Sequence, residues 1–270
     1  MHIRLISDIH FELSRNGLKL INKFIPKFTD IEQSSEEKVL ILAGDIGDPT
    51  SKLYKTFITK MSRQYDQVFI VTGNHEYYQS YTKKYDSNVE KLSSFTRYSI
   101  ENIDTIIKLV ATSLPNVHFL QRDSFIYNGI RFLGCTLWTK SDPKIAVYMN
   151  DYSNIVDMTP NRCEELHDTD IKWLEEELNK EESSEYKHTV VITHHLPTYK
   201  LIADKYVNHP MNSLFASDLD YLVEKANIWC CGHSHMAKHV TVGKCRCYLN
   251  PVGYSLENTG FNSDMSIMIS

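Results

Sequence analysis

The sequence predicts a single α/β domain that spans residues 1–270. Short apolar runs that suit strands alternate with amphipathic stretches from the first residue onward, as they do in α/β proteins. Several of the strand-like runs end in a cluster of polar residues. Hydrophobic residues make up 42% and charged residues 23% of the chain, which is the balance of a globular protein with a sizeable core.

Nine segments are expected to form strands because they are short, apolar and bounded by turn residues. The expected strands are His2 to Ser7, Lys38 to Ala43, Gln67 to Val71, Ser124 to Tyr127, Ile130 to Leu137, His188 to Thr193, Ile228 to Cys231, His239 to Val242 and Cys245 to Leu249. The pair Asn128-Gly129 is typical of a type I′ hairpin turn, and Gly243-Lys244 is a weaker signal of the same kind. Part of the sheet structure must therefore be antiparallel.

Four segments are expected to form helices, since each carries one apolar stripe at helical spacing. These are Ser51 to Tyr65, Ile100 to Leu114, Arg162 to Glu181 and Leu214 to Lys225. Residues 78–99 and 138–161 are polar and irregular, so we expect long connections there.

Charge and composition exclude several classes of partner. The net charge is −5 and the basic residues are scattered, which argues against long nucleic acid as a partner. No run of about 18 apolar residues could span a membrane, and the start of the chain lacks signal-peptide features, so a cytoplasmic protein is expected. The six cysteines lack CxxC spacing and are expected to be buried, reduced thiols.

Five short motifs follow predicted strands, where open α/β sheets collect ligand-binding groups. They are Asp8-Ile9-His10, Gly44-Asp45, Gly73-Asn74-His75-Glu76, His194-His195 and Gly232-His233-Ser234-His235. Carboxylate, imidazole and amide groups together suit Mn, Fe or Zn. A carboxylate can bridge two cations, and a two-metal site activates water near neutral pH. The glycines that precede ligands are expected to allow positive φ or close backbone approach.

The ordered set DxH, GD, GNHE, H and GHxH resembles the signature of the calcineurin-like metallophosphoesterases, and it runs from Asp8 to His235. The resemblance implies a four-layer sandwich of two mixed β-sheets flanked by helices. It also implies two divalent ions, Mn being expected and Fe, Zn, Co or Ni being alternatives. The first ion would be held by Asp8, His10, Asp45 and His235, and the second by Asp45, Asn74, His194 and His233.

The same resemblance implies hydrolysis of a phosphomonoester or phosphodiester by a metal-bridging hydroxide, with Asp45 as the bridging ligand. His75 would contact the phosphate and protonate the leaving group. His195, Asn150 and Asp151 are candidate substrate contacts. His195 could equally cap the turn before Pro197, and an Asn-Asp pair is also a common turn former. The substrate is expected to be a small phosphate ester or a nucleotide, and neither its identity nor the oligomeric state follows from these motifs.

Differences from two related branches limit which part of the family the chain resembles. The Ser/Thr protein phosphatases continue the second motif as GDxxDRG, whereas this chain has Gly44-Asp45-Ile46-Gly47-Asp48-Pro49 and lacks the arginine. Purple acid phosphatases place a tyrosine where Asp48 stands. The blocks GNHEYY, LWT, MNDY, THHxP and NPxGY are instead similar to a bacterial-type branch of phosphohydrolases and cyclic-nucleotide phosphodiesterases.

Two other functions of the same fold agree less well with the sequence. A non-catalytic metal-binding scaffold of the same fold would show lost ligands, and none of the motif ligands is missing. A nuclease of the same superfamily would carry additional DNA-contacting regions, which the acidic balance and the lack of a long C-terminal extension do not favour.

Overall fold

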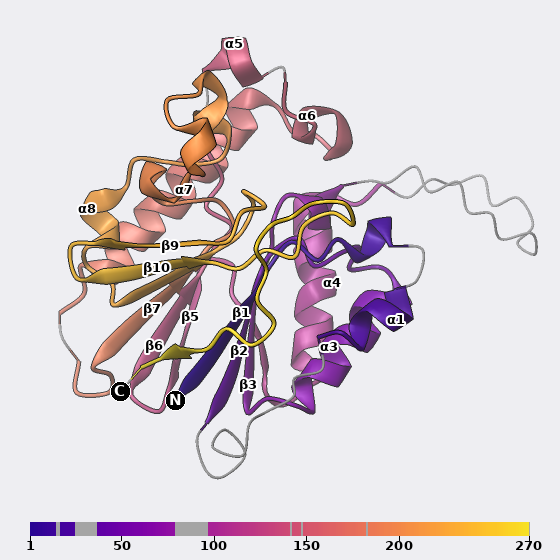
Figure 1. Cartoon of the computed structure of the whole chain (residues 1–270), viewed down its shortest axis with the longest axis vertical. Helices are drawn as coiled ribbons and strands as arrows, with labels where there is room; N and C mark the ends of the chain where they lie inside the picture. The colour runs from indigo at the N-terminus through magenta and orange to yellow at the C-terminus, as the bar shows by residue number, and fades with distance from the viewer. Residues whose placement is uncertain are drawn as a thin grey trace, which may run out of the picture.

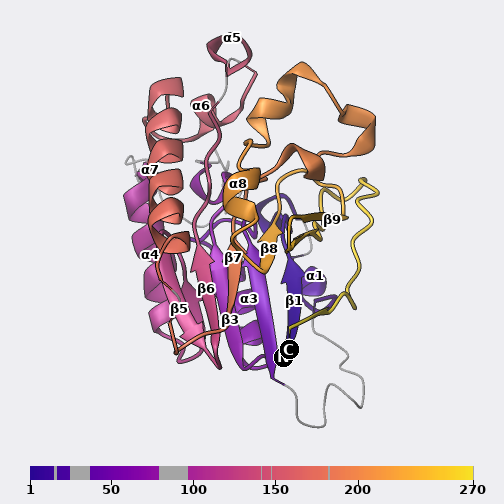
Figure 2. The same ribbon diagram turned by 90° about the vertical axis from the view of Figure 1, so that its left-hand side faces the viewer.

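The computed structural model describes residues 1–14, 17–24, 37–78, 97–140, 142–146, 148–181 and 183–269. Two β-sheets pack face to face, and helices cover their outer sides (Figure 1 and Figure 2). The expected α/β sandwich of two mixed sheets flanked by helices is confirmed.

The first sheet has five strands in the order β11-β1-β2-β3-β4. Strands β1 to β4 are parallel, and β11 joins β1 antiparallel. Their bounds are β1 His2–Ile6, β2 Lys38–Ala43, β3 Gln67–Val71, β4 Val117–Phe119 and β11 Ile267–Met268.

The second sheet has six strands in the order β5-β6-β7-β8-β10-β9. Its four inner strands are parallel, whereas β5 and β9 are antiparallel edges. The strands are β5 Asp123–Tyr127, β6 Ile130–Gly134, β7 His188–Ile192, β8 Ile228–Cys231, β9 Lys238–Val242 and β10 Cys245–Leu249. Both expected hairpins are present, and Asn128 and Gly129 have the positive φ angles of 47° and 75° that a type I′ turn needs.

Three of the four expected helices are confirmed within a few residues at each end, as α3 Lys52–Ser62, α4 Ile100–Thr112 and α7 Pro160–Leu178. Ser51, Ser99 and Thr159 cap their first turns by accepting backbone hydrogen bonds. Shorter helices are α1 Gly17–Ile21, α5 Pro143–Ala146, α6 Asp151–Asn154 and α8 Asp220–Val223, together with 3₁₀ turns at Phe11–Leu13, His75–Tyr77, Tyr199–Leu201, Asp204–Tyr206 and Pro210–Leu214.

The expected helix from Leu214 to Lys225 is wrong over most of its length. Only Asp220–Val223 is α-helical, and Pro210–Leu214 is a 3₁₀ turn. Between them the backbone pairs with Leu196, which donates from its N–H to Phe215 O and accepts from Ser217 N–H. These tertiary hydrogen bonds take the groups that a helix would use. The expected connection over residues 78–99 falls mostly on 79–96, which lie outside the described residues.

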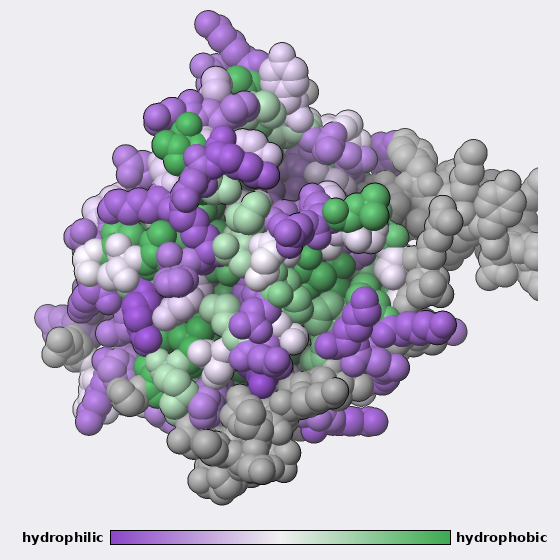
Figure 3. All heavy atoms as spheres, in the orientation of Figure 1, coloured by the Kyte–Doolittle hydropathy of each residue, from purple (hydrophilic) through white to green (hydrophobic). Residues whose placement is uncertain are grey.

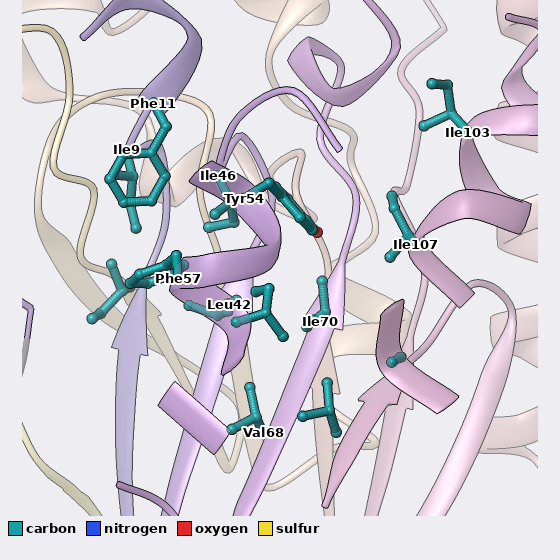
Figure 4. Packing of buried hydrophobic residues seen from close by; sticks show 14 of the residues in the cluster. Ile9, Phe11, Leu42, Ile46, Tyr54, Phe57, Val68, Ile70, Ile103 and Ile107 are labelled. Atoms are coloured by element: carbon teal, nitrogen blue, oxygen red, sulfur yellow. The ribbon is translucent and has the colours of Figure 1, made fainter. Parts of the chain in front are cut away.

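Apolar side chains form three layers, as a four-layer sandwich requires. Between the sheets, the rings of Phe69 and Phe132 stack with centroids 4.1 Å apart. The outer face of the first sheet packs on α3 and α4, where Leu42, Phe57 and Ile107 are buried together (Figure 4). A third cluster lies between the second sheet and α7 and α8. Burial of these faces is the main stabilising term of the fold.

The distribution of hydrophilic and hydrophobic residues on the surface agrees with this layered arrangement. Hydrophilic residues dominate the margin of the face shown in Figure 3, and hydrophobic residues gather in patches nearer its middle. All six cysteines are buried and free of disulfide bonds, as expected. No described helix is both long and apolar enough to span a bilayer.

Candidate metal centre

The carboxyl ends of five parallel strands bring the motif residues to one edge of the sandwich. Asp8 and His10 follow β1, Asp45 follows β2, Asn74 and His75 follow β3, His194 follows β7, and His233 and His235 follow β8. Because all five strands run in the same direction within their sheets, their ends converge although the residues are up to 227 positions apart.

Five of the seven expected metal ligands have left-handed backbone conformations, which non-glycine residues rarely adopt. Their φ angles lie between 48° and 70°, at Asp8, His10, Asp45, His233 and His235. Such conformations cost free energy and are characteristic of functional sites whose surroundings hold them in place. The strain is therefore concentrated where the side chains must point inward.

The glycines beside these ligands are required by space or by backbone conformation. Gly44 has a φ of 83°, and a Cβ on it would lie 2.5 Å from His194 Nδ1. A Cβ on Gly73 would lie 2.2 Å from Asp45 Oδ1, and one on Gly232 would lie 2.8 Å from Asp8 Oδ2. The side chains of the site thus occupy the volume that any other residue would need.

Replacing Gly73 with Ala is expected to abolish metal retention and to destabilise the fold by about 1–3 kcal/mol, because the new methyl group overpacks Asp45 and His194. Gly129→Ala is the matched control, since its Cβ would meet nothing within 4 Å and only its φ of 75° is unfavourable. That control should lose ~1 kcal/mol of stability and keep its metal. Measuring both metal content and urea-induced unfolding separates the loss of metal from the loss of stability. A Gly73→Ala protein with full metal content would contradict the assignment of Asp45 and His194 to the metal centre.

A first group of donor atoms surrounds one point. His10 Nε2 lies 3.1 Å from His235 Nε2, which lies 3.4 Å from Asp8 Oδ1. Each ring donates its Nδ1–H to a carboxylate, His10 to Glu12 at 3.0 Å and His235 to Glu257 at 2.6 Å. A carboxylate can only accept, so in the neutral form of each ring it is Nε2 that carries the lone pair. Two such lone pairs repel unless a proton or a cation lies between them.

A second group adjoins the first through Asp45. Asp45 Oδ2 lies 3.3 Å from His194 Nε2 and 3.8 Å from His10 Nε2, so one oxygen reaches both groups. His194 donates its Nδ1–H to Ala43 O at 2.9 Å, and its Nε2 lies 3.2 Å from His233 Nδ1. Among the described residues, the buried Oδ1 atom of Asn74 has no hydrogen-bond partner, as expected of an oxygen that would bind a metal.

The surroundings of both groups of donor atoms stabilise positive charge. Burial alone would lower the pKa of His194, but the charge of Asp45 and the hydrogen bond to it raise the pKa to about 10. Burial of His235 is likewise outweighed by Asp8 and Glu257, and its pKa rises to about 9. Burial would raise the pKa of Asp45, yet His194 and His75 hold it well below its usual range. The donor sets therefore fit divalent cations, whose binding would displace these protons.

Glu12 and Glu257 fix the rings of the candidate ligands, and the sequence motifs did not indicate either residue. Glu12 Oε1 accepts from His10 Nδ1 and, at 3.1 Å, from His75 Nδ1. Glu257 Oε2 accepts from His235 Nδ1 and from Tyr254 N–H. Carboxylates in this position hold the tautomer and orientation of a ligating imidazole. The only sequence signal was the position of Glu12 two residues after His10.

His75 lies beside the donors and borders a cavity. Its backbone N–H donates to Asp45 Oδ1 at 2.8 Å, and its Nε2 lies 3.5 Å from Tyr254 Oη. Burial would lower its pKa, but Asp45 and the hydrogen bond to Glu12 raise it above 6.5. The residue is therefore suited to carry a proton at Nε2.

The three candidate substrate contacts occupy different positions. Asn150 is exposed and lines a cavity of about 480 Å³ that also reaches Asp45, Asn74 and His75. Asp151 borders the same cavity, but only 1% of it is exposed. His195 is fully buried and is not among the cavity-lining residues. Burial and the charge of His194 lower the pKa of His195 to about 3, so its ring is neutral.

Asp151 contacts Asn74 directly. Its Oδ1 atom accepts from Asn74 Nδ2 at 2.8 Å and from Tyr78 Oη at 2.6 Å. The Asn74 amide is thereby fixed with Nδ2 toward Asp151, which leaves Oδ1 as its free acceptor atom among the described residues. This contact joins residues 77 positions apart.

Replacing Asp151 with Ala should weaken binding of the second ion by about 10–100-fold, because the Asn74 amide loses the acceptor that orients it. Asn150→Ala is the matched control, as its exposed side chain has no contact with Asn74. Titration with Mn²⁺ should show one weakened site in the first variant and two unchanged sites in the second. Equal affinities for Mn²⁺ in both variants would show that the Asn74 amide does not need Asp151 to orient it.

Residues 1–237 match the calcineurin-like phosphoesterase family. The chain is 29% identical to the uncharacterized protein L509 of Acanthamoeba polyphaga mimivirus, over 96% of this chain and 94% of that protein. The structure is similar to the crystal structure of the phosphopantetheinyl hydrolase PptH from Mycobacterium tuberculosis, with a TM-score of 0.66 and 17% identity over 95% of this chain and 93% of that one. This last similarity concerns the fold alone.

Proposed function

Because the chain belongs to the calcineurin-like phosphoesterase family, we propose that it hydrolyses a phosphate ester at a centre of two divalent cations. The observation that carries the proposal is the position of Asp45, whose Oδ2 atom lies within 3.8 Å of a donor in each group. A carboxylate shared in this way is the feature that a two-metal site needs and a single-ion site does not.

The side chains divide into two sets by the ion that they would hold. Asp8, His10, Asp45 and His235 would hold the first ion, and Asp45, Asn74, His194 and His233 the second. Such a pair of ions activates water as the nucleophile and neutralises charge on the phosphoryl oxygens. Manganese is the proposed metal, with Fe, Zn, Co or Ni as alternatives that the same nitrogen and oxygen donors accept.

His75 is proposed to contact the phosphoryl group and to donate a proton to the leaving oxygen. Its Nδ1–H is bonded to Glu12, which leaves Nε2 for the substrate, and His75 lines the cavity. The substrate is proposed to be a small phosphomonoester or phosphodiester, in keeping with the bacterial-type branch that the sequence blocks resemble.

The protein should bind two divalent ions per chain and hydrolyse phosphate esters only when they are present. Metal analysis after loading with Mn²⁺, followed by assay of aryl phosphates before and after chelation, tests both statements. A stoichiometry near one ion per chain would contradict the proposal that two ions share Asp45. Two tightly bound ions with no hydrolysis of any ester would favour the non-catalytic scaffold instead.

A further inference from the structure

We infer that the wall of the cavity opposite the metal centre binds the leaving group of the substrate, and that this leaving group is uncharged and aromatic or apolar. The inference rests on the proposed function, and it specifies the class of ester that the site takes. It concerns the described residues of the cavity, which has a volume of about 480 Å³, within the usual range of small-molecule sites.

The wall is built by two segments that lie above the strand ends. One comprises residues 148–151, which lead into α6, and the other comprises residues 202–215, between β7 and β8. Both views show these segments next to each other over the carboxyl ends of the strands (Figure 1 and Figure 2). Phe215 connects the wall to the metal centre, because its ring lies 5.0 Å from that of His233. A group bound to the wall would therefore be adjacent to a phosphoryl group at the metal ions.

Aromatic and apolar side chains dominate this wall. Five tyrosines among the described residues are exposed by 40% or more, and two of them, Tyr148 and Tyr206, belong to this wall, whereas Tyr254 lines the cavity beside His10 and His235. Met149 and Met211 belong to the same two segments and also line the cavity. Large apolar side chains gathered at one exposed site are typical of a ligand-binding surface, and methionine adapts well to varied apolar groups.

Charge excludes a second anionic group on the substrate. No lysine or arginine is among the described residues that line the cavity, whereas the carboxylates of Asp151 and Glu257 are. His209 accepts a hydrogen bond at Nδ1 from Met211 N–H, so this nitrogen does not donate to a bound anion. On the wall, a further phosphate or carboxylate would thus lie beside no lysine or arginine of the described cavity residues, and burying an unpaired charge is costly.

Two lysines near the rim do not supply that partner. Lys238 Nζ is bonded to Ile202 O at 2.7 Å and to Asp204 at 2.8 Å. Lys205 Nζ lies 4.7 Å from the centre of the Tyr206 ring and is not among the cavity-lining residues. The wall therefore selects against nucleoside polyphosphates and other multiply charged leaving groups.

Binding of non-hydrolysable phosphonates to the Mn²⁺-loaded protein tests the inference by calorimetry. Benzylphosphonate should bind about tenfold more tightly than methylphosphonate, because its ring contacts the wall. A carboxylate on the same ring, in 4-carboxybenzylphosphonate, should cancel that gain. Equal binding of all three compounds, or tightest binding of the carboxylated one, would overturn the inference.

Two variants and a control test whether side chains of the wall cause the preference for benzylphosphonate. Tyr206→Ala should remove most of the advantage of benzylphosphonate, whereas Tyr221→Ala should keep it, since Tyr221 is exposed to a similar degree (51% against 50%) but lies outside the cavity. Met211→Lys should reverse the preference and favour 4-carboxybenzylphosphonate. If Tyr206→Ala behaves like Tyr221→Ala, the wall does not bind the ring.

The outcome separates this inference from the proposed function. If phenyl phosphate is hydrolysed with Mn²⁺ and the phosphonates show no preference for a ring, the proposed function stands and the inference fails. If the ring preference is present and depends on Tyr206, but no ester is hydrolysed, the wall is assigned correctly and the proposed function fails.

Discussion

Replacing Asp45 with Asn is expected to lower kcat/KM by more than 100-fold. Its Oδ2 atom reaches both groups of donors, at 3.3 Å from His194 Nε2 and 3.8 Å from His10 Nε2, and its Oδ1 atom accepts from His75 N–H. The substitution removes a negative charge that both ions would share. Changes to residues that only orient a ligand cost about 10–100-fold, so loss of the shared carboxylate should exceed that range.

Asp48→Asn is the matched control for this prediction. Asp48 is the next carboxylate along the chain, but its Oδ1 atom accepts from the N–H and hydroxyl of Thr50 in the turn before α3, away from the donors. Activity and metal content of this variant should stay close to those of the unaltered protein. Both quantities should be measured with saturating Mn²⁺ in both variants. Equal losses of activity in the two variants would mean that Asp45 matters no more to the metal centre than Asp48 does.

Replacing His75 with Asn should reduce activity on alkyl phosphates by about 10²–10⁴-fold and leave activated aryl phosphates much less affected. An alkoxide is a poor leaving group and needs a proton, whereas a nitrophenolate does not. The geometry supports this role, because His75 lines the cavity and its Nδ1 atom is held by Glu12, which leaves Nε2 free to carry the proton. Measuring kcat/KM for both kinds of ester in the variant and the unaltered protein gives the comparison.

Metal content distinguishes the remaining roles of His75. A variant that retains two ions and loses activity equally on both esters would show that His75 only positions the phosphate or offsets its charge. A variant that loses an ion would make His75 a ligand, which is geometrically conceivable because an atom of its ring lies within 4.8 Å of donor atoms of His10 and Asp45. His239→Asn, on the exposed face of β9, serves as the control for a histidine outside the site.

Local patterns were enough to predict most of the fold. Strands such as β2 and β8 carry continuous apolar runs bounded by polar residues, and the structure gives them the bounds that the sequence predicted. Two strands were missed, β4 and β11, because three and two residues are too few to establish a period. The segment from Leu214 to Lys225 has helical spacing, yet pairing with Leu196 decides its conformation.

The candidate ligands could be predicted because each follows a strand and belongs to a short motif of metal-binding residue types. The sequence by itself thus determined the α/β class, the strand ends and the candidate donors, all of which depend on neighbours in the chain. Only the tertiary structure could place Glu257 on His235, Asp151 on Asn74 and Phe215 beside His233. These contacts join residues 18 to 77 positions apart, and no local pattern encodes them, because which side chains meet depends on how the strands and the loops between them pack.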